Sequence, residues 1–401
     1  MSAIPVLLDA RKLGDGGIGT YLENLVDGFL ELNELHGERI ALTLLVSPGD
    51  AAKRHQALFE RWQRSVRMVE EPAPKYSFAE YFLLARRHRA LCASVDLFHS
   101  PHYTLPFALP IPAVVTIHDI IHVTYPDSPL HRPTARMLIA SAIRRSRRVI
   151  TVSEHSARQI RQNFRVAPGM LSAIPNAVST GISRTEQSTI TEVCARYGVK
   201  GEYLVFVGSD RPHKGYRMLQ ECWSLLQQKR ATTPTLVVIG DRFDEATKRL
   251  GRDLRIADAV HYLGAVSRRD LSALLSGARA LLVPSLEEGF CLPALEAFAC
   301  ETAVVSTPIP AIAELGGDLV RFADGFDAPA FADAVAAVLA IPLTDRFRVG
   351  AGERAARFSR LAVAQATFDV YRSVLGAAVG GADGEVPERL TTTRESLEAV
   401  S

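Results

Sequence analysis

The chain has 401 residues, of which 47% are hydrophobic and 22% charged, and its formal net charge is +2. This length suits two domains better than one core, and the composition is that of a soluble globular protein. The balanced charge gives no indication of a nucleic-acid partner. Five cysteines without metal-ligand spacing argue against a disulfide framework and a structural zinc site. We expect a cytoplasmic protein, because no apolar run reaches membrane length and the start lacks signal-peptide features.

In the first half, short continuous apolar runs alternate with segments of helix length. Apolar runs without polar alternation are typical of strands buried on both faces of a parallel sheet. The predicted strands are Val6–Asp9, Leu42–Ser47, Leu97–Ser100, Val114–His118 and Val149–Ser153, and the crossover helices include Gly19–Glu31 and Ser153–Phe164.

A polar, turn-rich stretch interrupts this alternation, and we place a linker at residues 179–200. The alternation then restarts with predicted strands Leu204–Gly208, Leu236–Gly240, Val260–Leu263, Ala280–Pro284 and Ala303–Thr307. The sequence therefore predicts an α/β protein with two Rossmann-like, doubly wound domains, residues 1–178 and 201–355, facing each other across a cleft. An apolar stripe from Arg354 to Leu375 predicts a last helix, set at residues 356–377, before a disordered tail over 378–401.

The segment Ser285–Thr302 predicts a strand end, a tight loop and a helix that begins at Pro293. Such a loop offers unpaired backbone N–H groups and the positive end of a helix dipole, which suit phosphates or hydroxyls. Glu288 in the loop and Glu296 on the helix could accept hydrogen bonds from sugar or ribose hydroxyls. On spacing alone, a helix cap with two solvated glutamates explains the segment equally well.

A second candidate site follows the predicted strand that ends at Gly208. Arg211 and Lys214 lie in the next turn, where two cations suit a diphosphate, the lysine as a point charge and the arginine as a fork. Without further context, a solvated basic turn is the commoner explanation.

Two further motifs lie in the first half. The loop Gly14–Tyr21 has glycines that permit close backbone approach, but it lacks the full dinucleotide-binding spacing. His118 ends a predicted strand within Thr116-Ile117-His118-Asp119, a position where a lone histidine is more often structural.

Taken in order, these motifs resemble those of the family 4 retaining glycosyltransferases. Ser285–Thr302 resembles the E-x7-E signature of that family, and Val260–Ser267 resembles the segment that precedes it. Phe206–Gly215 resembles the donor-phosphate clamp of mannosyltransferases similar to those of O-antigen synthesis. Gly14–Tyr21 is similar to the family's GG-I-G-R-Y loop. The resemblance covers nearly all of residues 1–375.

This resemblance implies a GT-B architecture whose last helix returns to the first domain. It implies retaining transfer of a hexose, with mannose from GDP-mannose favoured, to a glycan or lipid-linked acceptor in cell-surface polysaccharide biosynthesis. No metal ion or other cofactor is expected. By the same resemblance the catalytic residues are His118, Glu288, Arg211 and Lys214, and the donor-binding residues are Gly16, Gly17, Gly208, Val266, Gly289, Phe290, Cys291, Leu292 and Glu296.

The sequence also departs from the family pattern. Cys291, Ala177 and Glu301 stand where glycines are usual, and a left-handed residue 301 would cost ~1 kcal/mol. These changes leave open a UDP-sugar-dependent transferase and a catalytically silent scaffold. The nearest other enzyme class is a two-domain epimerase or phosphorylase of similar architecture, and the E-x7-E segment with the Pro212–Gly215 loop favours family 4 over it. The basic clusters Arg86–Arg89 and Arg144–Arg148 suit either helix ends or contact with an anionic inner membrane.

Overall fold

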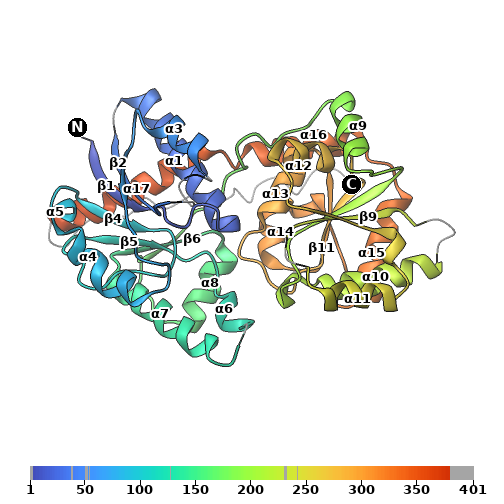
Figure 1. Ribbon diagram of the computed structural model, residues 1–401, viewed down its shortest axis with the longest axis horizontal. Coiled ribbons are helices and arrows are strands. Elements are labelled where there is room, and N and C mark those ends of the chain that lie inside the picture. Colours follow the sequence, from blue (N-terminus) through green and yellow to red (C-terminus); the bar gives the residue numbers. More distant parts are fainter. Residues whose placement is uncertain are drawn as a thin grey trace, which may run out of the picture.

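Two α/β domains lie side by side in this computed structural model (Figure 1). The structure describes residues 3–37, 39–49, 53, 55–126, 128–229, 233–241 and 243–379. Each domain is built on one parallel sheet with helices on both faces, so the predicted pair of doubly wound domains is confirmed.

The first sheet has seven parallel strands in the order β3-β2-β1-β4-β5-β6-β7. Its register places Val6 of β1 between Leu42 of β2 and Leu97 of β4, all three in the core. The strands are β1 (Ile4–Asp9), β2 (Ile40–Val46), β3 (Arg67–Glu70), β4 (Leu97–Ser100), β5 (Ala113–Thr116), β6 (Arg148–Thr151) and β7 (Leu171–Ala173).

The second sheet has six parallel strands in the order β10-β9-β8-β11-β12-β13. Of its central strands, β11 and β12 are fully buried and β8 is buried except at Val207, as their continuous apolar sequences predict. The strands are β8 (Tyr203–Val207), β9 (Thr235–Ile239), β10 (Val260–Gly264), β11 (Ala280–Val283), β12 (Ala303–Ser306) and β13 (Val320–Phe322).

Helices connect the strands and cover both faces of each sheet. In the first domain they are α1 (Gly16–His36), α3 (Gln56–Trp62), the π-helical η1 (Ala79–Leu83), α4 (Leu84–Arg87), α5 (Arg89–Cys92), α6 (Ile121–Thr124), α7 (His131–Arg145) and α8 (Glu154–Asn163). After it come α9 (Gln187–Arg196), η2 (Pro212–Lys214), α10 (Tyr216–Lys229), α11 (Glu245–Asp253), η3 (Ala257–Ala259), α12 (Arg268–Gly277), α13 (Leu292–Ala299), α14 (Pro310–Gly316), η4 (Gly317–Leu319), α15 (Ala328–Ala340), α16 (Asp345–Ala356) and α17 (Arg360–Val379).

The sequence did not predict the outer strands β3, β7 and β13. These strands have three or four residues, and none is buried along its whole length. At the edge of a sheet one side of the strand faces solvent or a loop, so the continuous apolar run that reveals a central strand is absent.

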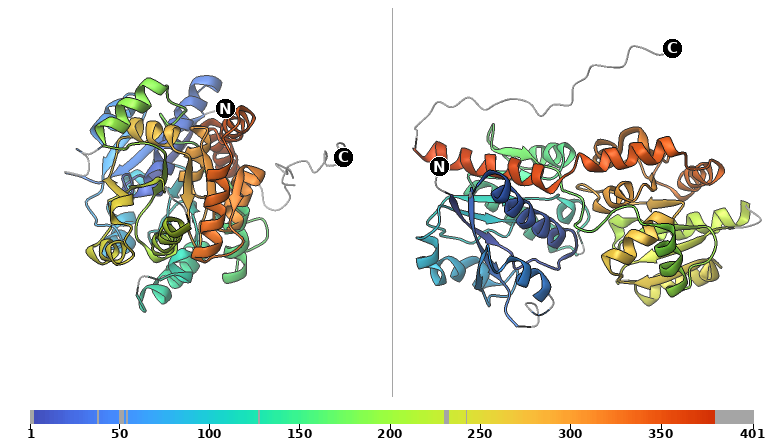
Figure 2. Two further views of the ribbon diagram at one scale, coloured as in Figure 1. Left: turned by 90° about the vertical axis from the view of Figure 1, so that its right-hand side faces the viewer. Right: turned by 90° about the horizontal axis from the view of Figure 1, so that it is seen from above.

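The last helix, α17, leaves the second domain and packs along α1 of the first, as Figure 2 shows from above. Its buried residues Phe368 and Tyr371 belong to the same core as Val6. The Tyr371 hydroxyl lies 2.6 Å from Nδ1 of His99 on β4. The expected return of this helix to the first domain is therefore confirmed.

The predicted final helix is in fact two. A break after α16 lets α17 begin at Arg360 rather than at Arg354, because the Ser359 hydroxyl accepts the backbone N–H of Ala362 and starts a new helix. At the break, the Phe358 carbonyl accepts a hydrogen bond from the backbone N–H of Val178, 3.1 Å away. The two chain segments that join the domains are thus bonded to each other.

The predicted disordered tail falls almost entirely on residues 380–401, outside the described part of the chain. Among the described helices, no single one is both long and apolar enough to cross a bilayer; one pair, Ala328–Ala340 with Asp345–Gly376, passes that test together but is bent by 119°.

The contact between α1 and α17 predicts a large effect of one methyl group. A Cβ added at Gly28 would lie 2.5 Å from the Arg360 carbonyl oxygen, so Gly28→Ala must displace α17. We expect it to lower the free energy of unfolding by about 1–3 kcal/mol, measured by urea denaturation.

The matched control is Gly376→Ala, at an α17 position where an added Cβ meets nothing within 4 Å. Its effect should be neutral or stabilising by up to ~1 kcal/mol, because alanine favours the helix. Equal effects of the two substitutions would contradict the packing described for α1 and α17.

Candidate active site

The loop between β11 and α13 brings a carboxylate to a lysine of the second domain. Glu288 Oε1 lies 2.7 Å from Lys214 Nζ and 2.7 Å from the Ser285 hydroxyl, and the Glu288 side chain is buried. Burial favours the neutral amine, but Glu288, together with Cys291 and Asp119, outweighs it and raises the pKa of Lys214. Lys214 is therefore a cation whose charge is held in place beside one carboxylate.

A glycine makes this juxtaposition possible. Gly215 has φ 66°, and a Cβ there would lie 1.9 Å from the Pro284 carbonyl oxygen, so only glycine fits. The backbone N–H of Leu286 donates to the His213 carbonyl at 2.7 Å. The basic turn and the glutamate loop, far apart in sequence, thus form one unit at the carboxyl end of the sheet.

This loop also touches the first domain, at Gly289. A Cβ there would lie 2.6 Å from the His118 carbonyl oxygen and 3.0 Å from Cβ of Asp119. The Gly289 carbonyl accepts hydrogen bonds from the hydroxyls of Ser153 (2.6 Å) and Ser156 (3.2 Å) at the start of α8. The structure therefore brings His118, Gly289, Glu288 and Lys214 together between the domains.

His118 is partly exposed and held in a neutral form. Its Nε2 lies 3.0 Å from the Pro101 carbonyl oxygen, which can only accept, so Nε2 carries the proton. Burial lowers the pKa of His118, although neighbouring Asp119 acts in the opposite direction. The edge of the ring contacts Tyr21. This leaves Nδ1 as the nitrogen with a free lone pair.

The helix α13 begins directly after this loop with a left-handed residue, Cys291 (φ 74°). Glu301, just beyond its end, is also left-handed at φ 58°. Both occupy positions where the resemblance led us to expect glycine, and both have the left-handed backbone that glycine favours. Ala177 differs, because it is absent from the residues with positive φ in the described chain.

Glu296 on α13 lies away from Glu288 and faces the linker. The Ser179 hydroxyl donates to its carboxylate, and burial raises the pKa of Glu296 while Arg268 opposes that shift. Arg268 forms two hydrogen bonds, of 2.6 and 2.5 Å, with the buried carboxylate of Glu23 on α1. A second link between the domains therefore lies beside Glu296.

The remaining predicted site residues lie around these groups. Gly16 and Gly17 open α1, and a Cβ on Gly17 would contact the Leu292 side chain at 3.6 Å. Gly208 directly follows β8, at the carboxyl edge of the sheet. Val266 precedes α12 and packs on the core of the second domain. Phe290 is buried, and its ring packs against that of Phe358.

Arg211 is exposed and forms no ion pair within the described residues. Burial raises the pKa of Tyr76, a residue of the first domain, to about 12, and the charge of Arg211 is among those that oppose this shift. Arg211 therefore faces the first domain. Arg211 therefore lies on the rim of the site and not beside Lys214 and Glu288.

Arg268 and Glu23 were not predicted from the sequence. One local feature could have indicated Arg268: it opens a helix after the N-cap Ser267, at the positive end of the helix dipole, where a cation is unfavourable. Its distant partner Glu23 cannot be found in this way. Glu287, which contacts His155 and Gln159 of α8, was not predicted either.

Within the described ranges, no three His, Cys, Asp or Glu side chains gather closely enough to hold a metal ion.

Comparison with known proteins shows two matching families. The family described as Glycosyltransferase Family 4 matches residues 15–181, and Glycosyl transferases group 1 matches residues 196–358. Together they cover both domains.

Two curated relatives are similar over part of their length. The O-antigen chain mannosyltransferase RfbU of Salmonella typhimurium is 29% identical over 240 residues, and O-antigen chain mannosyltransferase B of Escherichia coli is 28% identical over 242 residues. Each match covers 58% of this chain and 62% of the relative.

Among solved structures, Anabaena HepE in complex with UDP-glucose superposes with a TM-score of 0.71 over 92% of this chain and 100% of that one. At 18% identity, this likeness shows the shared fold.

The left-handed residue after α13 gives one prediction. Glu301→Gly should raise the free energy of unfolding by about 0.5–1 kcal/mol, because glycine adopts a positive φ without strain. The same substitution at the exposed helical Glu353 should lower it by a similar amount. Thermal and urea unfolding measure both, and a loss of stability in Glu301→Gly would contradict the strain.

The ion pair between the domains gives another. Arg268→Ala leaves the buried Glu23 carboxylate without its bidentate partner and should shift the protein toward more open arrangements. Small-angle X-ray scattering should show a larger radius of gyration. Arg269→Ala, at the exposed neighbouring position, is the control and should leave scattering unchanged. An unchanged profile for both variants would show that the pair does not hold the domains together.

Proposed function

We propose that this chain, whose two halves match Glycosyltransferase Family 4 and Glycosyl transferases group 1, transfers a hexose from a nucleotide-sugar donor with retention of configuration. The favoured donor is GDP-mannose, and the acceptor is a glycan or lipid-linked saccharide in cell-surface polysaccharide biosynthesis. The observation that carries the proposal is the pair of the partly exposed Lys214 with the buried Glu288, next to the contact between Gly289 and His118.

The choice of mannose rests on the relatives. Two of them are named as O-antigen chain mannosyltransferases, and the match spans 62% of the length of each. The structure of HepE was solved with UDP-glucose, which supports the class of donor but leaves a UDP-sugar as the alternative.

In this proposal the second domain stabilises the leaving diphosphate. Lys214 supplies a fixed positive charge, and Arg211 at the rim supplies a second cation when the donor is bound. The start of α13 adds the positive end of its dipole. Pro293 has no N–H, and the N–H of Ala294 is bonded to the Cys291 carbonyl, so the dipole and not a set of free N–H groups is the contribution of this turn. Charge that develops on the leaving phosphate thus meets preorganised positive groups, and no metal ion is needed.

The transferring sugar lies between the two domains. Glu288 retains acceptor capacity for sugar hydroxyls beyond its contacts to Lys214 and Ser285. His118 offers the lone pair of Nδ1 to a hydroxyl, since Nε2–H is bonded to Pro101. Glu296, buried near Ser179, is the group for the ribose hydroxyls.

We propose a same-face mechanism for the transfer. The bond between the anomeric carbon and the departing phosphate oxygen breaks, and the acceptor hydroxyl forms a new bond on the same face of the sugar. The acceptor proton goes to that phosphate oxygen, so the charges balance. A double displacement would instead use a carboxylate nucleophile beside the anomeric carbon.

We further propose that the protein contacts the anionic, cytoplasmic face of the inner membrane. This contact is supported by a basic groove beside α7. Met137 of the same helix and Leu130 just before it also expose apolar side chains. The arginines that line this groove are Arg136, Arg144, Arg147, Arg148 and Arg165. Arg145 of the same cluster is engaged structurally, by the Leu105 and Pro106 carbonyls.

The test is calorimetric titration with GDP, UDP, ADP and dTDP and their sugars, with EDTA present. We expect selective binding of GDP and GDP-mannose, weakened about 10- to 100-fold by Lys214→Ala, because a charge-assisted contact contributes about 1.5–3 kcal/mol. Glu296→Ala should weaken it similarly. Lys248→Ala, an exposed lysine on α11, is the control and should bind as the wild type does.

The other outcomes separate the alternatives. Selective binding of UDP would indicate a UDP-sugar donor, and binding only without EDTA would contradict metal independence. No binding of any nucleotide would favour the catalytically silent scaffold. For an active enzyme, NMR of the product must show the anomeric configuration of the donor, and an inverted product would overturn the same-face mechanism.

A further inference from the structure

A lysine of the first domain is buried without a hydrogen-bond acceptor. Lys12 follows β1, and its side chain is only 3% exposed. Within the described part of the chain, its Nζ has no hydrogen-bond partner. Burial lowers the pKa of Lys12, while Glu80 and Asp9 act against this shift. A buried ammonium with all of its donors unused is unfavourable unless something else binds there.

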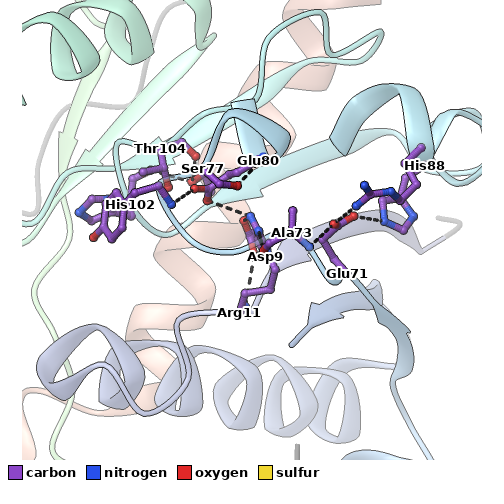
Figure 3. A network of polar contacts seen from close by, with 12 residues as sticks. Asp9, Arg11, Glu71, Ala73, Ser77, Glu80, His88, His102 and Thr104 are labelled. Atoms are coloured by element: carbon purple, nitrogen blue, oxygen red, sulfur yellow. Dashed lines mark hydrogen bonds and ion pairs between the residues drawn. The ribbon is translucent and has the colours of Figure 1, made fainter. Parts of the chain in front are cut away.

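The nearby carboxylates are already engaged by other donors, as Figure 3 shows. Both oxygens of Asp9 accept hydrogen bonds from Arg11, at 2.9 and 2.6 Å. One oxygen of Glu80 accepts from Arg11 at 2.9 Å, and the other accepts from the backbone N–H of Tyr76. These acidic groups compensate the charge of Lys12 at longer range, but they leave its N–H groups unbound.

Tyr76 covers the ammonium group. Its ring centroid lies 4.0 Å from Lys12 Nζ, and the residue is 53% exposed. Its backbone is left-handed, with φ 63°, which is strained for a non-glycine residue. The half-exposed ring therefore lies between the ammonium group and the solvent.

A second unused polar atom lies beneath the same ring. His102 is 5% exposed, its ring contacts Tyr76 edge-on at 5.7 Å, and its Nδ1 has no partner among the described residues. Burial lowers the pKa of His102, so its ring is neutral, and one nitrogen carries a proton that it can donate. Lys12 and His102 thus converge on one covered position.

This position lies next to the candidate active site. The charge of Lys12 also acts on His118, whose pKa burial lowers, and Tyr76 faces Arg211 of the opposite domain. The covered position is therefore on the first-domain side, across from the groups assigned to the donor diphosphate. A ligand there would approach His118 from the side of the acceptor.

We propose that Lys12 and His102, beneath Tyr76, bind an anionic group of the acceptor, either a phosphate or a carboxylate. This rests on the proposed function, since it assigns the acceptor of the same reaction to the class of acidic saccharides. The anion accepts hydrogen bonds from Lys12 Nζ and from the protonated nitrogen of His102. The Tyr76 ring swings away on entry and contacts the bound saccharide.

The test titrates the protein, saturated with GDP, with mannose 6-phosphate, glucuronate and neutral mannose. We expect one of the two anions to bind and mannose to bind at least about ten-fold more weakly. Lys12→Met should weaken anion binding by at least the same factor and leave GDP binding unchanged. The control is Lys75→Met, which removes a neighbouring lysine that is paired with Asp15 at 2.6 Å, and should bind as the wild type does.

A second measurement needs no variant. In wild-type protein labelled with ¹³C at histidine Cε1, the His102 resonance should shift on titration with the bound anion and not with mannose. Tighter binding of mannose 6-phosphate indicates a phosphate on the acceptor, and tighter binding of glucuronate indicates a carboxylate.

Three results would overturn the proposal: neither anion binds, anion binding survives Lys12→Met, or the His102 resonance does not respond. Failure of the proposed function gives a different pattern, because GDP binding is then lost while titration without nucleotide still reports a Lys12-dependent anion site.

Discussion

The loop before α13 meets the first domain backbone to backbone at Gly289, where a Cβ would lie 2.6 Å from the His118 carbonyl oxygen. No other residue can occupy that position without separating the domains. The contact holds Glu288 and Lys214 of one domain against His118 of the other, and two serine hydroxyls bond to the same glycine. The proposed chemistry needs groups from both halves of the chain, so it depends on glycine, which has no side chain, at position 289.

Lys214 and Lys12, which lie on opposite sides of the contact between the domains, illustrate opposite electrostatic arrangements. Lys214 has a carboxylate partner at 2.7 Å and a raised pKa, so its charge is secured before any ligand arrives. Lys12 lies near carboxylates that are occupied by Arg11, and burial lowers its pKa. One lysine is prepared by the protein alone, whereas the other has binding capacity that only a ligand can use.

Much of this fold could be read from the sequence, because parallel strands buried on both faces have continuous apolar runs and each helix follows its strand closely. The edge strand β3 could not, since Arg67–Glu70 is partly exposed and charged at both ends. At the site, local motifs located Glu288 and Lys214 but not their contact. The pair of Arg268 with Glu23 joins residues 245 positions apart, and no local pattern encodes such a partnership.

The hydrogen bond between Val178 and Phe358 joins the two segments that connect the domains. Since α17 completes the core around α1, the second domain is in effect an insertion into the first and is tethered at both of its ends. A domain joined by two adjacent chain segments can rotate mainly about the axis that passes through both segments. A domain joined by a single linker can rotate in all directions. Two neighbouring connections therefore restrict the relative orientation of the domains more than one would, and they favour the contact of Gly289 with the His118 carbonyl.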